Sequence, residues 1–310
     1  MVKSTIWPHK RNPYDIYLLI LQDPRMPITQ LARKLRVNPK TAEIWWINAL
    51  KKQIIMIPRL RRKSFLNFRE YIYFLKVKDP QESYEQCIKD RNLVYFSVHT
   101  GFCNFEMISK RPIDPDGEIV LSGPRSDYHV TIPPDNTFQE AGERIVRKLN
   151  MIDHLEHEES PLLFREQKYE PWDHKDEGLY EEFCNDLRKP LTHVMKKTNT
   201  YSDKIMNWYR TRNQFGHTIT MFFPQGLHSY NPVTYVLETE FDSVLIHLFS
   251  ELPTPSVFYR INSVLMMSIY LPFFPSPEAR IIPYKILSIL QKKELVKKYT
   301  NSIVQYFYRY

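Results

Sequence analysis

The sequence predicts an α+β protein built from two similar halves. Helix-like and strand-like segments alternate along its 310 residues, and a composition of 43% hydrophobic and 14% aromatic residues is typical of folded domains. A single constant shift, which we call the repeat shift, lays Ile28–Leu31 on Leu191–Val194, Trp45-Trp46 on Trp208-Tyr209, and Val94–Phe96 on Val257–Tyr259. One shift that matches both helical and strand-like segments indicates an internal repeat.

Composition excludes several classes of protein. The three cysteines are far apart, which predicts neither a disulfide framework nor a zinc site and suits a reduced cytosol. No signal-peptide pattern is visible, and the most apolar run, Val264 to Phe274, is too short to span a bilayer. We therefore expect a cytoplasmic protein without a membrane partner. No Walker motif, nucleophile–base pair or GxGxxG is present, so no catalytic residue, metal or cofactor is predicted.

Charge is unevenly distributed along the chain. Residues 1–70 contain fifteen Lys and Arg against four Asp and Glu, whereas residues 151–187 contain three against twelve. This asymmetry indicates a polyanion-binding N-terminal region and an acidic connector. Within the connector, His154 and His157 form an HxxH pair beside Glu158, a spacing that is able to bind a metal ion. No further ligand pattern supports such a site, so we prefer a solvated acidic linker.

Residues 28–52 predict a helix-turn-helix. Apolar residues recur at helical spacing from Ile28 to Leu35, and a second helix opens at Asn38 and Pro39. Asn38 suits the N-cap and Pro39 the first helical position, where no N–H is needed. The inward face of the second helix includes Trp46, which we expect to be buried, with Trp45 partly exposed.

A basic hairpin is expected to follow. An apolar stretch leads into a turn that contains Arg59, Arg61, Arg62 and Lys63, and the chain then returns toward Tyr71. Placed after a helix-turn-helix, such a hairpin is a wing that contacts DNA phosphates, which supplies affinity rather than sequence discrimination.

Residues 71–149 predict a sheet domain of ferredoxin-like βαββαβ order, with Thr137–Leu149 as its second helix. Gly101 is the first glycine of the chain and lies between two predicted strands, which requires either a positive φ or a close backbone approach there. Residues 112–136 are rich in Gly, Pro and Asp and are expected to form a loop-rich insertion.

These residues resemble the leucine-responsive/asparagine-operon (Lrp/AsnC, feast–famine) transcriptional regulators. The segment QLARKLRVNPKTAEIWWINALKKQII fits their winged helix-turn-helix through Leu31, Leu35, Ala42 and Ile55, although Gln53 replaces a usual glycine and Trp45 and Ile47 replace arginines. The effector (RAM) domain of the family is a βαββαβ unit with a "tG..d" motif. Thr100, Gly101 and Asn104 match that motif and become candidate effector-binding residues, against the alternative of a hairpin glycine without a ligand.

The resemblance implies the following fold and function. The fold is a winged helix-turn-helix plus a ferredoxin-like RAM-type domain, duplicated in tandem, with an internal pseudo-dimer and a possible homodimer. The function is a transcriptional regulator that binds double-stranded DNA, has no enzymatic activity, and responds to a small effector such as an amino acid. The expected DNA-binding residues are Lys40, Thr41, Glu43, Asn48, Lys51, Arg59, Arg61, Arg62, Lys63, Lys204, Arg210 and Arg212.

The predicted domain boundaries follow these motifs. They are 1–66 for the winged helix-turn-helix, 67–150 for the RAM-type domain, 151–178 for the acidic linker, 179–231 for a degenerate second helix-turn-helix and 232–310 for a second ferredoxin-like domain.

Two other functions stay open. Siroheme decarboxylases of haem biosynthesis also resemble this family as fused two-copy chains, and they need basic and imidazole side chains to hold propionate and acetate carboxylates. His99, His129, Arg111 and Arg125 are the residues available for that role. The third possibility is an architectural protein that coats DNA without sequence specificity.

Overall fold

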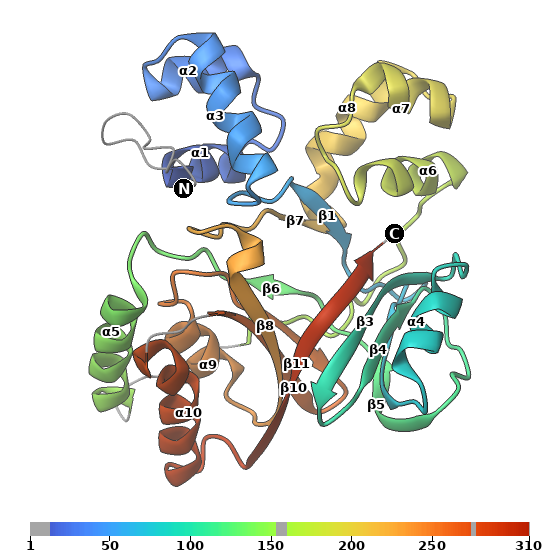
Figure 1. The fold of residues 1–310 in the computed structure, drawn as a ribbon. Coiled ribbons are helices and arrows are strands. Elements are labelled where there is room, and N and C mark those ends of the chain that lie inside the picture. Colours follow the sequence, from blue (N-terminus) through green and yellow to red (C-terminus); the bar gives the residue numbers. More distant parts are fainter. Residues whose placement is uncertain (1–12, 153–159, 274–276, 310) are drawn as a thin grey trace. The chain divides into compact units, whose positions relative to one another are not determined.

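The computed structural model describes residues 13–152, 160–273 and 277–309 (Figure 1). His154 and His157 lie outside these residues. The described chain folds into two units, each of which combines segments from both halves of the sequence. Among the described residues, unit 1 comprises 13–61 and 172–228, and unit 2 comprises 62–152, 160–171, 229–273 and 277–309.

Unit 1 is mainly helical. The first half contributes α1 (Pro13–Gln22), α2 (Ile28–Leu35), α3 (Pro39–Lys51) and β1 (Arg59–Arg62). The second half contributes α6 (His174–Phe183), α7 (Leu191–Thr198), α8 (Ser202–Thr211), the 3-10 turns η2 (Arg212–Gln214) and η3 (Leu227–Ser229), and β7 (Gly216–Ile219).

Local sequence signals explain the start of α3. The Asn38 side chain accepts a hydrogen bond from the Lys40 N–H at 2.9 Å, and Pro39 is the first helical residue, as predicted. Trp46 is buried at 6% exposure and packs in a core with α1 and α2, whereas Trp45 is half-buried. Both expectations for the tryptophans are confirmed.

The predicted basic hairpin is wrong. Residues 59–62 form the strand β1, which pairs with β7 of the second half in a two-stranded sheet, and Ile55 bridges Phe222 just before it. Residues 63–70 form no returning strand beside β1 and contain one isolated bridge, between Phe65 and Phe68.

Two arginines link the helical segments that the two halves of the chain contribute to unit 1. Arg25 Nη1 donates to the carbonyls of Leu187 and Lys189, and Arg188 donates to the carbonyls of Pro24 and Met26 at 2.7 and 3.0 Å. We call these two side chains the arginine clasp. Each guanidinium also lies over an aromatic ring, Arg25 over Tyr209 at 5.7 Å and Arg188 over Trp46 at 5.1 Å.

Unit 2 is built on a nine-stranded antiparallel sheet of order β5-β2-β4-β3-β11-β8-β10-β9-β6. Its strands are β2 (Tyr71–Lys76), β3 (Leu93–Gly101), β4 (Phe105–Ser109), β5 (Glu118–Pro124), β6 (His129–Val130), β8 (Tyr230–Glu238), β9 (Val257–Ile261), β10 (Val264–Pro272) and β11 (Lys298–Arg309). Its helices are α4 (Pro80–Cys87), α5 (Phe138–Asn150), α9 (Asp242–Phe249) and α10 (Pro277–Lys292).

The sheet curls until strands near its two ends meet. Arg125, just after β5, forms an antiparallel bridge with Ile261 at the end of β9, and Asn262 donates to the Ser122 carbonyl at 3.1 Å. One apolar cluster, which includes Phe74, Tyr259 and Met266, lies on the face that the curl encloses. On the outer face, α4 covers β3 and β4, while α5, α9 and α10 gather on β8 and β10 (Figure 1).

The insertion 112–136 is loop-rich, as predicted, but it also contains β5 and β6, and β5 takes the sheet position beside β2. The described part of the acidic linker is largely exposed, as Leu163, Phe164 and Tyr169 are, but it is anchored at two points and ends earlier than predicted. Leu162 is buried, the Glu166 N–H donates to the Ser64 carbonyl at 2.7 Å, and α6 begins at His174.

The helix predicted at 137–149 is present as α5, with a capping box at Thr137 and Glu140. It is not the second helix of a first-half βαββαβ unit, because it follows β5 and β6 and packs with β8, α9 and α10 of the second half.

Candidate functional site

The residues proposed to read DNA lie on the outer face of α3. Lys40, Glu43 and Lys51 are exposed, and Thr41 and Asn48 are half-buried. The same helix also exposes Ile44 and Ile47 at 48% and 52%. This face is therefore partly apolar.

The basic residues that follow α3 make contacts within the protein. Arg61 donates to the Cys184 carbonyl at 3.0 Å and to Asn185 Oδ1 at 3.2 Å. Arg62 is 2% exposed and lies over the Phe68 ring at 4.1 Å, and Lys63 pairs with Glu166 at 3.6 Å. Arg59 is half-buried in β1. These four side chains do not form the exposed phosphate-binding cluster that the sequence predicted.

The basic residues of the second half are also partly engaged. Lys204 pairs with Asp173 at 2.9 Å and with Asp176 at 3.5 Å. Arg212 lies over the Tyr209 ring at 4.2 Å and donates to Thr218 Oγ1, whereas Arg210 is exposed.

The candidate effector residues Thr100, Gly101 and Asn104 lie at the β3–β4 turn. The Asn104 amide bonds both the N–H and the carbonyl of Val77 at 2.8 Å, so its polar atoms already have backbone partners. Gly101 has φ +141°, and an added Cβ would lie 2.4 Å from the Asn301 carbonyl oxygen and 2.6 Å from Ser302 Cα. The predicted need for glycine is confirmed, whereas effector binding stays a prediction.

The close approach at Gly101 brings β11 to a group of polar side chains on the enclosed face of the sheet. We call Ser97, His99, Glu106 and Ser302 the His99 network. Successive odd-numbered residues of β3 share one face, Glu106 of β4 lies opposite Ser97, and Ser302 of β11 lies opposite Gly101. The strand register therefore places all four side chains together.

Every polar atom of the His99 ring has a partner. His99 Nε2 lies 3.0 Å from Glu106 Oε2 and 2.8 Å from Ser97 Oγ, and Nδ1 lies 2.9 Å from Ser302 Oγ. Ser97 also donates to Glu106 at 3.1 Å. The ring is completely buried, and the Glu106 side chain is 7% exposed.

This arrangement is able to hold a proton without losing a hydrogen bond. An ionised Glu106 only accepts, so Nε2 carries the hydrogen that points to it. Nδ1 then accepts from the Ser302 hydroxyl when the ring is neutral and donates to it when the ring is protonated, because a hydroxyl does either. The His99 network is thus able to accommodate a proton on the enclosed face of the sheet.

Aromatic side chains continue the same face toward solvent. Tyr95, two residues before Ser97, stacks on Phe307 of β11 with ring centroids 6.2 Å apart, and Phe307 is 47% exposed. Tyr259 lies deeper on this face, where burial, followed by the neighbouring Glu106, raises its pKa well above the ordinary value. Tyr259 therefore remains a neutral hydroxyl near the Glu106 carboxylate.

The four residues proposed to hold carboxylates do not converge. Arg125 is 1% exposed and fully used: it donates to Glu70 at 2.6 Å and to the Arg62 carbonyl at 2.9 Å, and it lies over Tyr128 at 4.3 Å. His99 belongs to the His99 network, His129 is half-buried in β6, and Arg111 is exposed. Sequence reasoning found His99 but missed Ser97, Glu106 and Ser302.

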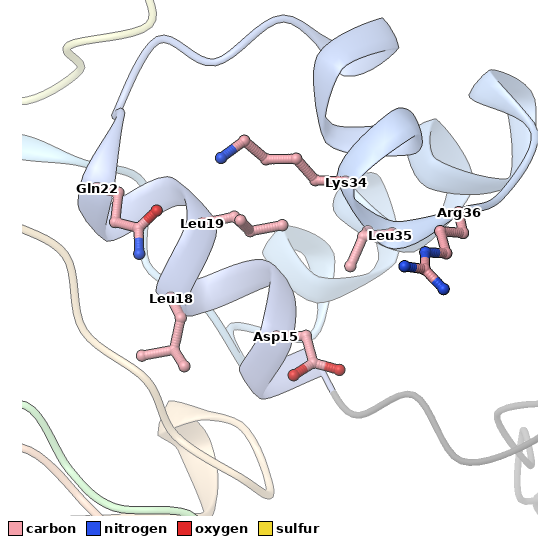
Figure 2. A pocket seen from close by; sticks show the side chains of 7 residues that line it. All are labelled: Asp15, Leu18, Leu19, Gln22, Lys34, Leu35 and Arg36. Atoms are coloured by element: carbon pink, nitrogen blue, oxygen red, sulfur yellow. The ribbon is translucent and has the colours of Figure 1, made fainter.

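A surface groove of about 520 Å³ in unit 1 offers less chemistry (Figure 2). Figure 2 shows Asp15, Leu18, Leu19 and Gln22 of α1 on one side, with Lys34, Leu35 and Arg36 of α2 and its C-cap on the other. Its lining includes no histidine or cysteine and one carboxylate. Among residues 13–152, 160–273 and 277–309, no group of three or more His, Cys, Asp or Glu side chains suits a metal, and no helix is long and apolar enough to cross a membrane.

Comparison with known proteins identifies a fold. No family model and no curated protein matches the sequence. Two crystal structures of the siroheme decarboxylase NirDL share the fold, one of them in co-complex with an iron-uroporphyrin III analogue. In both, the likeness covers 96% of this chain and 92% of that chain at a TM-score of 0.51, with 11% identity to the complex and 10% to the other structure.

This finding corrects the expected function. The sequence predicted a transcriptional regulator without enzymatic activity. The two structures that share the fold along 96% of this chain are both of an enzyme, the siroheme decarboxylase NirDL. An Lrp/AsnC-like fold remains consistent with the likeness. The regulator interpretation is wrong. The prediction that Lys40, Thr41, Glu43, Asn48 and Lys51 contact DNA has no further support.

Proposed function

We propose that this chain is an enzyme of the siroheme decarboxylase kind, which removes carbon dioxide from a carboxylate side chain of a tetrapyrrole. The observation that carries the proposal is the fold likeness to NirDL along 96% of this chain, which includes both halves and both units. The candidate site adds groups that suit the reaction.

The reaction needs a proton donor in a largely dry site. The bond between the side-chain carbon and its carboxyl carbon breaks, carbon dioxide leaves, and the electron pair left on the side-chain carbon takes up a proton. The His99 network is a proton-bearing group on the enclosed face of unit 2, with a buried carboxylate as partner. Its surroundings exclude water, which strengthens electrostatic interactions there.

The aromatic pair beside the network fits a planar substrate. Tyr95 and Phe307 stack with an angle of 29° between their rings and lie on the same face as His99. A macrocycle stacked on these rings gains from aromatic contact and from apolar burial.

We also infer that the two halves of the chain are repeats, each a helix-turn-helix segment followed by a ferredoxin-like segment. The arginine clasp supports this most strongly. The repeat shift lays Arg25 on Arg188, and each arginine bonds the carbonyls on either side of the other. The rings that they cover, Trp46 and Tyr209, are related by the same shift. Such reciprocity is what a two-fold relation between like surfaces produces.

The elements of unit 2 support the repeat with a slightly different offset. One constant offset places Lys76, the last residue of β2, on Glu238, the last residue of β8. The same offset places Pro80, the first residue of α4, on Asp242, the first residue of α9. We call it the sheet offset. It is shorter than the repeat shift by one, and a slip of one position exchanges the two faces of a strand.

The strand order agrees with the repeat. The strands β11-β8-β10-β9 of the second half follow the order of a βαββαβ unit, and β5-β2-β4-β3 repeats that spatial order with β5 in the place of the fourth strand. In the first half β5 follows β4 without a helix between them, so only the order of the strands repeats. The repeat shift is therefore out of register in the sheet, and the sheet offset is the one that relates corresponding strand positions.

Anaerobic incubation of the protein with siroheme, followed by mass spectrometry of the tetrapyrrole, tests the proposed function. We expect a product lighter by at least one carbon dioxide. His99→Gln should abolish the conversion, because glutamine keeps polar contacts but does not deliver a proton, whereas the exposed His228→Gln serves as matched control and should retain it. Unchanged siroheme in the presence of the folded protein would contradict the proposal.

A further inference from the structure

The His99 network has a position in the second half that corresponds to it, and the strand pairing identifies that position. The sheet offset places Phe74 of β2 on Val236 of β8. Phe74 pairs with Glu106 of β4, and Val236 pairs with Met266 of β10. Met266 is therefore the counterpart of Glu106.

The same reasoning extends along the hairpin. Glu106 pairs with Ser97, and Met266 pairs with Tyr259. Tyr259 is therefore the counterpart of Ser97, and Ile261, two residues further, is the counterpart of His99.

The fourth member follows from the outer strands. Ser302 of β11 pairs with Thr234, the sheet offset places Ile72 on Thr234, and Ile72 pairs with Gly123 of β5. Gly123 is therefore the counterpart of Ser302. Its φ of +157° is one that residues with a side chain rarely adopt, and an added Cβ would lie 2.7 Å from the Asn262 side chain, so a serine there would be strained.

The corresponding position has lost the polar groups of the His99 network. Tyr259, Ile261 and Met266 are 5%, 0% and 0% exposed and belong to one apolar cluster on the enclosed face. The Tyr259 hydroxyl is the one polar group among the four counterparts, and its raised pKa keeps it neutral. Imidazole and carboxylate are both missing there, so this position does not perform the same proton chemistry.

We infer that each chain has a single active centre and binds one tetrapyrrole, even though the fold presents two related positions. The inference rests on the proposed function. The centre combines Ser97, His99 and Glu106 of the first half with Ser302 from the last strand of the second half. The position around Tyr259, Ile261 and Met266 stabilises the sheet.

Titration of the protein with iron-uroporphyrin III, followed by absorbance, tests the inference by counting bound ligand. We expect one equivalent per chain at saturation. Tyr95→Val removes one ring of the aromatic pair at the active centre and should weaken binding roughly tenfold or more. Val257→Ala alters the counterpart of Tyr95 in β9 and is the matched control, which should leave both affinity and stoichiometry unchanged.

The outcomes separate the inference from the proposed function. Two bound equivalents per chain would overturn the single active centre but leave tetrapyrrole binding intact. Loss of binding in Val257→Ala, with unchanged binding in Tyr95→Val, would do the same. If neither the unchanged protein nor either variant binds iron-uroporphyrin III, and circular dichroism shows that all three are folded, the proposed function and the inference are both overturned.

Discussion

The arginine clasp makes a quantitative prediction about the stability of unit 1. Arg25→Ala leaves the carbonyls of Leu187 and Lys189 without these donors, and Arg188→Ala does the same to Pro24 and Met26. Because the two sets of contacts are reciprocal, the two single variants should lose similar amounts of free energy of unfolding.

The structure sets the size of that loss. Hydrogen bonds that involve a charged donor contribute about 1.5–3 kcal/mol each, and each cation–π contact about 0.5–1 kcal/mol. Both arginines are half-buried, and burial lowers the pKa of each guanidinium, a sign that desolvation offsets part of the gain. We therefore expect each substitution to cost about 2–4 kcal/mol. The double variant should lose less than the sum, because each arginine positions the backbone that the other one bonds.

Urea unfolding followed by tryptophan fluorescence measures the effect directly. Trp45, Trp46, Trp172 and Trp208 all lie in the segments of unit 1, so their emission reports on this unit. Arg33→Ala on the exposed side of α2 is the matched control and should change stability by less than about 0.5 kcal/mol. If one arginine variant behaves like this control while the other is strongly destabilised, the reciprocal clasp is wrong.

Three further predictions concern unit 2. Gly101→Ala should lower the free energy of unfolding by about 4 kcal/mol or more, because its Cβ would lie 2.4 Å from the Asn301 carbonyl oxygen. Thermal melting measures this loss, and a near-normal melting temperature would contradict the close approach of β11 to β3. Burial raises the pKa of the Cys103 thiol to about 12, so at neutral pH iodoacetamide should label it only after unfolding, and prompt labelling of the native protein would refute this. Burial alone would raise the pKa of Asp242, but hydrogen bonds from Arg260 and Ser160 hold it below its ordinary value. That stabilisation is present above the ordinary aspartate pKa and is lost as pH falls through the lowered one, so Arg260→Gln should show a smaller loss of stability on acidification than the unchanged protein.

The features that the sequence predicted correctly depend on residues close together in the chain. The cap at Asn38 and Pro39 acts within one turn of helix, and helical periodicity placed Trp46 in the core. Gly101 was predicted from one unusual residue between two strands, and its conformation is dictated by a close neighbour. Local physical chemistry was sufficient in each case.

The features that the sequence did not predict depend on partners far away in the chain. β1 pairs with β7, so Arg61 and Arg62 make contacts within the protein instead of lying in the exposed phosphate-binding hairpin that was predicted. Ser302 joins His99 from the other half of the chain because β11 lies beside β3. No spacing or periodicity within β3 indicates which strand will become its neighbour.

One missed feature did have a signal in the sequence. Asp23-Pro-Arg-Met-Pro27 and Asp186-Leu-Arg-Lys-Pro190 share the pattern Asp-x-Arg-x-Pro and are related by the repeat shift. Each aspartate accepts a hydrogen bond from the N–H of the arginine two residues later, at 3.1 and 2.7 Å. Extending the repeat from Ile28 back to Asp23 would have marked Arg25 and Arg188 as equivalent residues, although not the contacts that they make.

The central claim is that this chain decarboxylates a tetrapyrrole with the help of the His99 network. Release of labelled carbon dioxide from siroheme labelled in its side-chain carboxyl groups tests that claim most directly, with the protein and with its His99→Gln variant compared under anaerobic conditions. The account predicts label in the gas phase with the unchanged protein and a loss of release in the variant. Label that stays entirely on the tetrapyrrole, or equal release by both proteins, would contradict it.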